Sequence, residues 1–123
     1  MNVFDSSAVL AVLYDERGRP NAEARLPSGV ISTVNLAEVL GDYVASGRGD
    51  LAKARQAFDK LGLVLASPDD GQASRAAELR RPGLSLGDRF CLALGEAQGE
   101  RIVTADQKWA ALPDIKTPLE MIR

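Results

Sequence analysis

Short apolar runs alternate with longer amphipathic or alanine-rich stretches along most of the chain. The apolar runs hold few polar residues on either face, which is typical of strands buried within a parallel sheet. We expect strands at residues 2–4, 30–31, 63–65 and 101–103, with 115–116 as the candidate for a fifth. The stretches between them predict helices at residues 8–14, 21–26, 33–46, 50–61, 68–81, 85–98 and 106–111. The alternation therefore predicts an α/β fold, with a mostly parallel sheet of four to five strands covered by helices on both faces.

The size and composition of the chain agree with one folded domain. Its 123 residues are 46% hydrophobic and 26% charged, which is the balance of a globular protein. We therefore expect a single domain spanning residues 1–123. No apolar run approaches the roughly 20 residues that a membrane-spanning helix needs, and the N-terminus lacks the features of a signal peptide. These observations predict a cytoplasmic protein with no membrane partner.

The chain contains no histidine and one cysteine. The absence of histidine excludes serine–histidine hydrolysis, histidine-pair ribonuclease chemistry and histidine-ligated zinc. Cys91 lies in an apolar helical stretch, so we interpret it as a small buried residue. Carboxylates must therefore do most of any chemistry at neutral pH, alone or through a metal ion. The net charge of −2 makes nucleic acid a less expected partner, although one groove can still be basic.

Four carboxylates occupy places where a ligand site is expected. Asp5 and Asp106 come just after predicted strands, and ligands of open parallel sheets bind beyond the carboxyl ends of the strands. Asp88 falls in the first turn of a predicted helix, where the helix dipole favours a charged carboxylate. Glu38 lies among apolar residues on another helix, with Asn35 as a neutral hydrogen-bond partner on the same face. Clustered carboxylates repel one another unless a cation compensates them, so the group predicts a Mg²⁺ or Mn²⁺ site.

Each of these acids also has a purely structural interpretation. Asp5, or either serine after it, could cap the first helix. Glu38 could lie on a solvated helix face, in line with Asp42. Asp88 could complete a capping box, and Asp106 could fall in the first turn of a short helix. Capping does not compete with catalysis, because a carboxylate that is positioned by one can be used for the other.

Four segments carry a resemblance to a known family. They are residues 4–7 (FDSS), 32–39 (STVNLAEV), 84–89 (LSLGDR) and 103–109 (VTADQKW). In this order and at compatible spacing, they resemble the motifs of PIN-domain ribonucleases and, more narrowly, those of the VapC toxins of type II toxin–antitoxin systems. The resemblance extends from Asp5 to Trp109, and it retains all four acids.

The resemblance implies a three-layer α/β/α fold and a catalytic pocket formed by Asp5, Glu38, Asp88 and Asp106. Mg²⁺ or Mn²⁺ would be held mainly by Asp5 and Asp88, with the other two acids as direct or water-mediated ligands. Hydrogen bonds from Ser6 and Thr104, together with Asn35, would orient the pocket.

The resemblance also implies an activity and partners. The protein would be an endoribonuclease that hydrolyses RNA, most commonly tRNA, through metal-activated water, and it would leave 5′-phosphate and 3′-hydroxyl ends. A VapB-type antitoxin would inhibit it and would supply any contact with DNA, and the toxin would commonly be a homodimer. The nearby cations Arg80, Arg81, Arg89 and Lys108 are candidates for phosphate contacts, with solvated surface charge as the alternative.

Other interpretations remain at this point. A non-catalytic PIN-like module that binds RNA or protein is the main alternative, although the retained acids argue against it. A receiver-type phosphoacceptor domain would need an aspartate after the third strand, where this chain has Ala66 and Ser67. Trp109 could stack on a base, but its spacing from Leu112 favours a place in the core.

Overall fold

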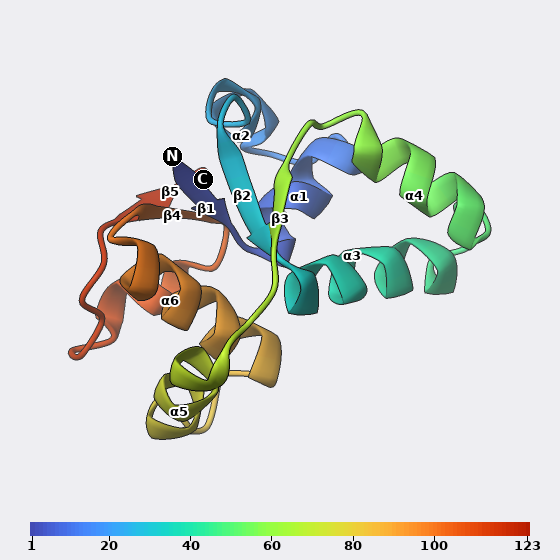
Figure 1. Ribbon diagram of the computed structural model, residues 1–123. Helices are drawn as coiled ribbons and strands as arrows, with labels where there is room; N and C mark the ends of the chain where they lie inside the picture. The colour runs from blue at the N-terminus through green and yellow to red at the C-terminus, as the bar shows by residue number, and fades with distance from the viewer.

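Five parallel strands form the central sheet of the computed structural model, which describes residues 1–123 (Figure 1). The strand order is β3-β2-β1-β4-β5. Phe4 of β1 pairs with Ile31 of β2 on one side and with Val103 of β4 on the other. The carboxyl ends of the three central strands therefore lie at one edge of the sheet. The strands are β1 (Asn2–Phe4), β2 (Gly29–Ser32), β3 (Val64–Ala66), β4 (Arg101–Thr104) and β5 (Leu119–Met121).

Helices cover both faces of this sheet. Neighbouring residues of a strand point to opposite faces, and accordingly Phe4 belongs to one buried cluster and Val3 to another. Residues of α1 to α4 join the cluster of Phe4, whereas residues of α6, together with Leu79 at the end of α5, join that of Val3, and Figure 1 shows α5 and α6 together on one side of the sheet. The helices are α1 (Ser6–Leu13), α2 (Arg19–Ala24), α3 (Thr33–Ala45), α4 (Leu51–Asp59), α5 (Asp70–Glu78), α6 (Leu86–Gln98) and the 3₁₀ helix η1 (Gln107–Ala111). The predicted three-layer α/β/α fold is confirmed.

The C-terminal strand is where the sequence-based prediction is wrong. The fifth strand is Leu119–Met121 rather than residues 115–116. The main chain at Pro118 accepts a hydrogen bond from Ile102, which starts the pairing with β4. Glu120, in the middle of this edge strand, forms ion pairs with Arg25 and Arg101. A charged residue interrupts the apolar pattern there, because an edge strand does not need to be apolar on both faces.

Three further features differ from the predictions. The helix predicted at 21–26 begins two residues earlier, at Arg19, because the fixed φ angle of Pro20 suits a first helical turn. A 3₁₀ helix forms where a short α-helix was predicted at 106–111, and Asp106 is its N-cap rather than part of its first turn. The third strand lies at the sheet edge, with Val64 and Leu65 exposed. No helix combines the length and apolar character needed to cross a membrane.

Candidate active site

A pocket of about 270 Å³ lies beyond the carboxyl ends of β1 and β4, where α1, α3 and α6 meet. Five of its eight lining residues are carboxylates, and none is a lysine or arginine. None of these five carboxylates takes part in an ion pair elsewhere in the chain. The negative charge of the pocket is therefore uncompensated by the protein itself. The lining residues are Asp5, Ser6, Ser7, Leu10, Glu38, Asp42, Asp88 and Asp106.

Asp5 is the most buried acid of the pocket, with 4% of its surface exposed. It is the N-cap of α1, where its Oδ1 accepts the Ala8 N–H at 2.9 Å. The Thr104 hydroxyl donates to its Oδ2 at 2.6 Å, and the Ser7 hydroxyl lies 2.8 Å from both oxygens. Burial raises the pKa of Asp5 from 3.8 to about 6, because these hydrogen bonds only partly offset desolvation and the charge of Asp88 adds repulsion. The carboxyl group is thus rigidly held and costly to ionise without a cation.

Glu38 is positioned by side chains of two helices. The Ser6 hydroxyl and the Asn35 amide both donate to its Oε1, the amide at 2.8 Å. Asn35 is buried and its amide also donates to the Gly87 carbonyl at 3.1 Å, which ties α3 to α6. A Cβ atom at Gly87 would clash with the Glu38 carboxylate, so α6 approaches this side chain as closely as only glycine allows.

Asp88 and Asp106 cap the elements that carry them. Asp88 forms a reciprocal capping box with Ser85 at the start of α6, and burial together with the charges of Asp106 and Glu38 raises its pKa. Asp106 caps η1 by accepting the Lys108 N–H at 3.1 Å. Its own N–H donates to the Thr104 hydroxyl, which in turn donates to Asp5. The capping box expected at Asp88 is confirmed, whereas Asp106 is an N-cap rather than part of a first helical turn, and both carboxylates line one pocket.

The set of donors suits a hard divalent cation. In three of the four sequence-predicted acids only one carboxylate oxygen accepts a hydrogen bond within the protein, which leaves Oε2 of Glu38, Oδ1 of Asp88 and Oδ2 of Asp106 as ligand atoms. All donors are oxygen, the preference of Mg²⁺ and Mn²⁺. No three acidic side chains converge closely enough to enclose an ion by themselves. Water or substrate oxygens would have to complete the coordination, as is usual for Mg²⁺.

Three contributors were not among the sequence-predicted site residues. The Ser7 hydroxyl links Asp5 to the Ala105 N–H, and its position directly after Ser6 is the only sequence signal for this role. Asp42 lines the pocket one helical turn after Glu38, as the helical spacing indicates. The close approach at Gly87 is a tertiary contact that no local pattern reveals.

The predicted substrate-contact cations do not line the acidic pocket. Arg80, Arg81 and Arg89 line a separate hollow of about 510 Å³. There Arg81 forms two hydrogen bonds with the Asp114 carboxylate, at 2.6 and 2.7 Å, and Arg89 donates to two main-chain carbonyls. Lys108 lines another hollow, next to Asp106.

Two residues with a structural interpretation lie in the core. Cys91 is fully buried, and Trp109 is 1% exposed, which confirms both predictions. Trp109 therefore does not stack on a base.

Solved structures of other proteins share this fold. A toxin–antitoxin complex from Klebsiella pneumoniae is similar in structure, with a TM-score of 0.77 and 20% identity over 100% of this chain and 98% of that chain. VapBC2 from Rickettsia felis, bound to a promoter DNA fragment, is similar with a TM-score of 0.73 and 16% identity, over 98% of this chain and 97% of that chain. DNA-bound VapBC from Salmonella typhimurium is similar with a TM-score of 0.72 and 18% identity, over 99% of this chain and 98% of that chain. No curated protein matches in sequence.

The family model of the PIN domain matches residues 3–115, which include all four predicted acids. Because this match covers most of the 123 residues, the chain belongs to the PIN domain family.

Proposed function

We propose that this protein is a divalent-metal-dependent endoribonuclease, the toxin of a type II toxin–antitoxin system. The observation that carries the proposal is the pocket itself, in which five carboxylates meet without any lysine or arginine in a PIN-domain chain. Such a pocket attracts a cation and would repel a phosphodiester in the absence of one. The substrate class is RNA, with tRNA as the expected target, and the place of action is the cytoplasm, where that RNA is found.

The residues of the chain have distinct roles in this proposal. Asp5 and Asp88 would hold Mg²⁺ or Mn²⁺, with Glu38 and Asp106 as further ligands, directly or through water. The bound cation would make water nucleophilic near neutral pH and stabilise the charge that develops on the phosphate. Thr104 keeps Asp5 and Asp106 at a fixed separation through its single hydroxyl. The absence of histidine fits hydrolysis by water, which leaves 5′-phosphate ends and no cyclic phosphate.

Similar structures support the antitoxin partner in this proposal. Three of them are toxin–antitoxin complexes or VapBC proteins, and two are bound to DNA. We infer a VapB-type antitoxin that blocks the acidic pocket and carries the contact with DNA, and a homodimer of the toxin.

The proposal is tested by incubating total tRNA and rRNA with the antitoxin-free protein in Mg²⁺ or Mn²⁺ and mapping the RNA ends. We expect discrete cuts with 5′-phosphates that disappear in EDTA. An Asp88→Asn variant controls for contaminating nuclease. Cleavage that persists in this variant, or cyclic-phosphate ends, would contradict the proposal. The absence of any metal-dependent cut would instead favour a non-catalytic PIN-like module.

A further inference from the structure

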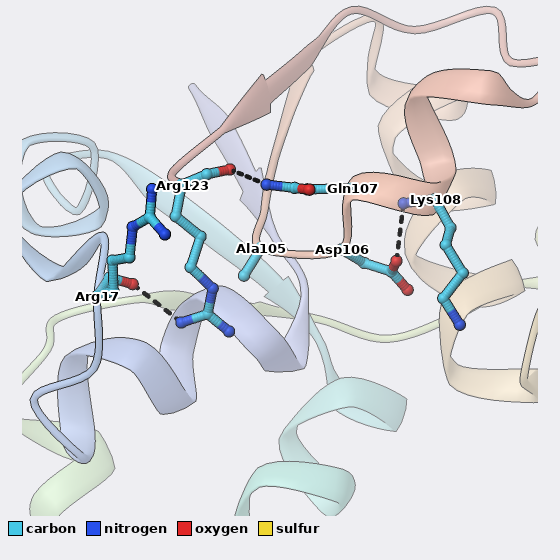
Figure 2. A pocket seen from close by; sticks show the side chains of 6 residues that line it. All are labelled: Arg17, Ala105, Asp106, Gln107, Lys108 and Arg123. Atoms are coloured by element: carbon cyan, nitrogen blue, oxygen red, sulfur yellow. Dashed lines mark hydrogen bonds between the residues drawn. The ribbon is translucent and has the colours of Figure 1, made fainter.

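A second hollow, of about 480 Å³, opens beside the acidic pocket and shares Asp106 with it (Figure 2). This hollow is mainly positive, whereas the acidic pocket is negative. Three cationic side chains line it, whereas Asp106 is its one acidic residue. The lining residues are Arg17, Ala105, Asp106, Gln107, Lys108 and Arg123.

The cations of this hollow come from distant parts of the chain, and hydrogen bonds hold Arg123 in place. Arg123 donates from Nη1 to the Arg17 carbonyl at 2.9 Å, and the Gln107 amide donates to the main-chain oxygen of Arg123 at 3.0 Å. Figure 2 shows Arg17 and Arg123 together on one side of Ala105, with Lys108 on the far side of Asp106. The hollow is therefore bounded by positive charge on two sides.

Little negative charge compensates these cations. Neither Arg17 nor Lys108 takes part in an ion pair, and Arg123 has only a 3.4 Å contact with Glu16. Two guanidinium groups on one wall repel each other unless an anion lies between them. Guanidinium groups also match the geometry of phosphate oxygens. By contrast, the hollow at Arg81 is partly neutralised by Asp114.

We propose that this cationic hollow binds a backbone phosphate of single-stranded RNA next to the phosphate that is cleaved. The inference rests on the proposed function and adds to it the residues that hold the substrate. A strand whose scissile phosphate lies in the acidic pocket has a neighbouring phosphate that needs a cationic site close by. The hollow supplies one, because both cavities meet at Asp106. Arg17 and Arg123 bind from one wall, and Lys108 binds from the other.

Binding without metal tests this subsite separately from cleavage. Fluorescence anisotropy measures the affinity of a labelled, mixed-sequence RNA of about 20 nucleotides in EDTA, over a range of salt concentrations. The variants are Arg17→Ala, Lys108→Ala and their combination. Lys60→Ala is the matched control, since it removes one positive charge from a residue that is exposed at the C-terminal end of α4 and does not line this hollow. Arg17→Glu reverses one charge, and thermal unfolding shows that each variant is folded.

We expect each single variant to bind about fivefold more weakly at about 0.1 M salt, and the slope of log affinity against log salt to become shallower by about 0.7 per lost contact. Lys60→Ala should bind like the unmodified protein. Equal binding by all variants would overturn the subsite, as would an absence of RNA binding by the unmodified protein at low salt. Unchanged RNA binding with weakened antitoxin binding would assign the hollow to an acidic protein segment instead, and would also overturn the proposal.

The two proposals fail separately. Mn²⁺-dependent cleavage, measured on the same preparations, reports on the proposed function. Cleavage without any effect of the Arg17 and Lys108 variants on RNA affinity would refute the subsite alone. Weakened RNA binding by these variants, in a protein that never cuts, would refute the nuclease and leave the subsite.

Discussion

Replacing Asp5 with asparagine should abolish cleavage and yet stabilise the metal-free protein at about pH 8. Burial raises the pKa of Asp5 from 3.8 to about 6, so its charged form is less favourable in the folded state than in the unfolded chain. One pKa unit corresponds to about 1.4 kcal/mol, which makes this cost about 3 kcal/mol when the carboxyl group is ionised in both states. Asparagine has the shape of the neutral acid and avoids the cost.

The hydrogen bonds of Asp5 reduce this gain. Asparagine offers one acceptor oxygen to the Ala8 N–H, while the Ser7 and Thr104 hydroxyls must reorient toward its amide. Rearranged hydrogen bonds of this kind cost about 1 kcal/mol. We therefore expect a net stabilisation of about 2 kcal/mol at high pH.

The direction in which this stability difference changes with pH shows whether ionisation of Asp5 causes it. Because the folded-state pKa of Asp5 is raised, its stabilising contribution is fully present below about pH 3.8 and is lost as pH rises through about 6. The advantage of Asp5→Asn should accordingly be absent near pH 4 and grow to its full size by about pH 7.

Urea unfolding in EDTA at about pH 4.5, 6 and 8 measures this difference, as a midpoint shift of about 1 M for a typical urea dependence. Asp59→Asn is the matched control, because Asp59 is exposed on α4 and lies outside the pocket. Its effect should stay within about 0.5 kcal/mol. A destabilised Asp5→Asn protein at pH 8, or a gain that does not change with pH, would refute the reasoning.

Three further outcomes are expected. Mn²⁺ at about 100 times its dissociation constant should raise the unfolding free energy of the unmodified protein by about 2.7 kcal/mol. It should leave the unfolding free energy of Asp5→Asn unchanged, and equal stabilisation of both proteins would contradict the metal site. Gly87→Ala should lower cleavage by about tenfold or more because its Cβ would displace the Glu38 carboxylate, whereas Gly41→Ala, with no atom within 4 Å of the added Cβ, should leave the rate unchanged. Thr104→Val should raise the pKa of Asp5 further by removing a donor to the charged form, measured from carboxyl ¹³C shifts in EDTA, and a lowered pKa would contradict this role.

The sequence predicted the central strands β1, β2 and β4, and the helices α1 and α3 that follow the first two, because these strands are buried and the apolar patterns are uninterrupted. β1, β2 and β4 lie within a residue or so of their predicted positions. β5 was misplaced because Glu120 makes its contacts with Arg25 and Arg101, which a local pattern does not show.

The same distinction holds for the site. The meeting of Asp5 and Asp106 at one pocket follows from the rule that parallel strands end at the same edge. The positions of Glu38 and Asp42 follow from helical spacing. By contrast, the hydroxyl bridges and the cationic hollow depend on contacts between residues about a hundred positions apart. Such contacts exist only once the chain has folded.

Binding of Mn²⁺ to the pocket tests the central claim most directly. Electron paramagnetic resonance of free Mn²⁺ gives its affinity for the unmodified protein, for Asp88→Asn and for the Asp59→Asn control, without any need for an RNA substrate. We predict that Asp59→Asn binds Mn²⁺ as the unmodified protein does and that Asp88→Asn binds it at least about tenfold more weakly, a loss of about 1.4 kcal/mol or more. Equal affinity of all three proteins, or no binding by the unmodified protein, would contradict the claim that these carboxylates form a metal site.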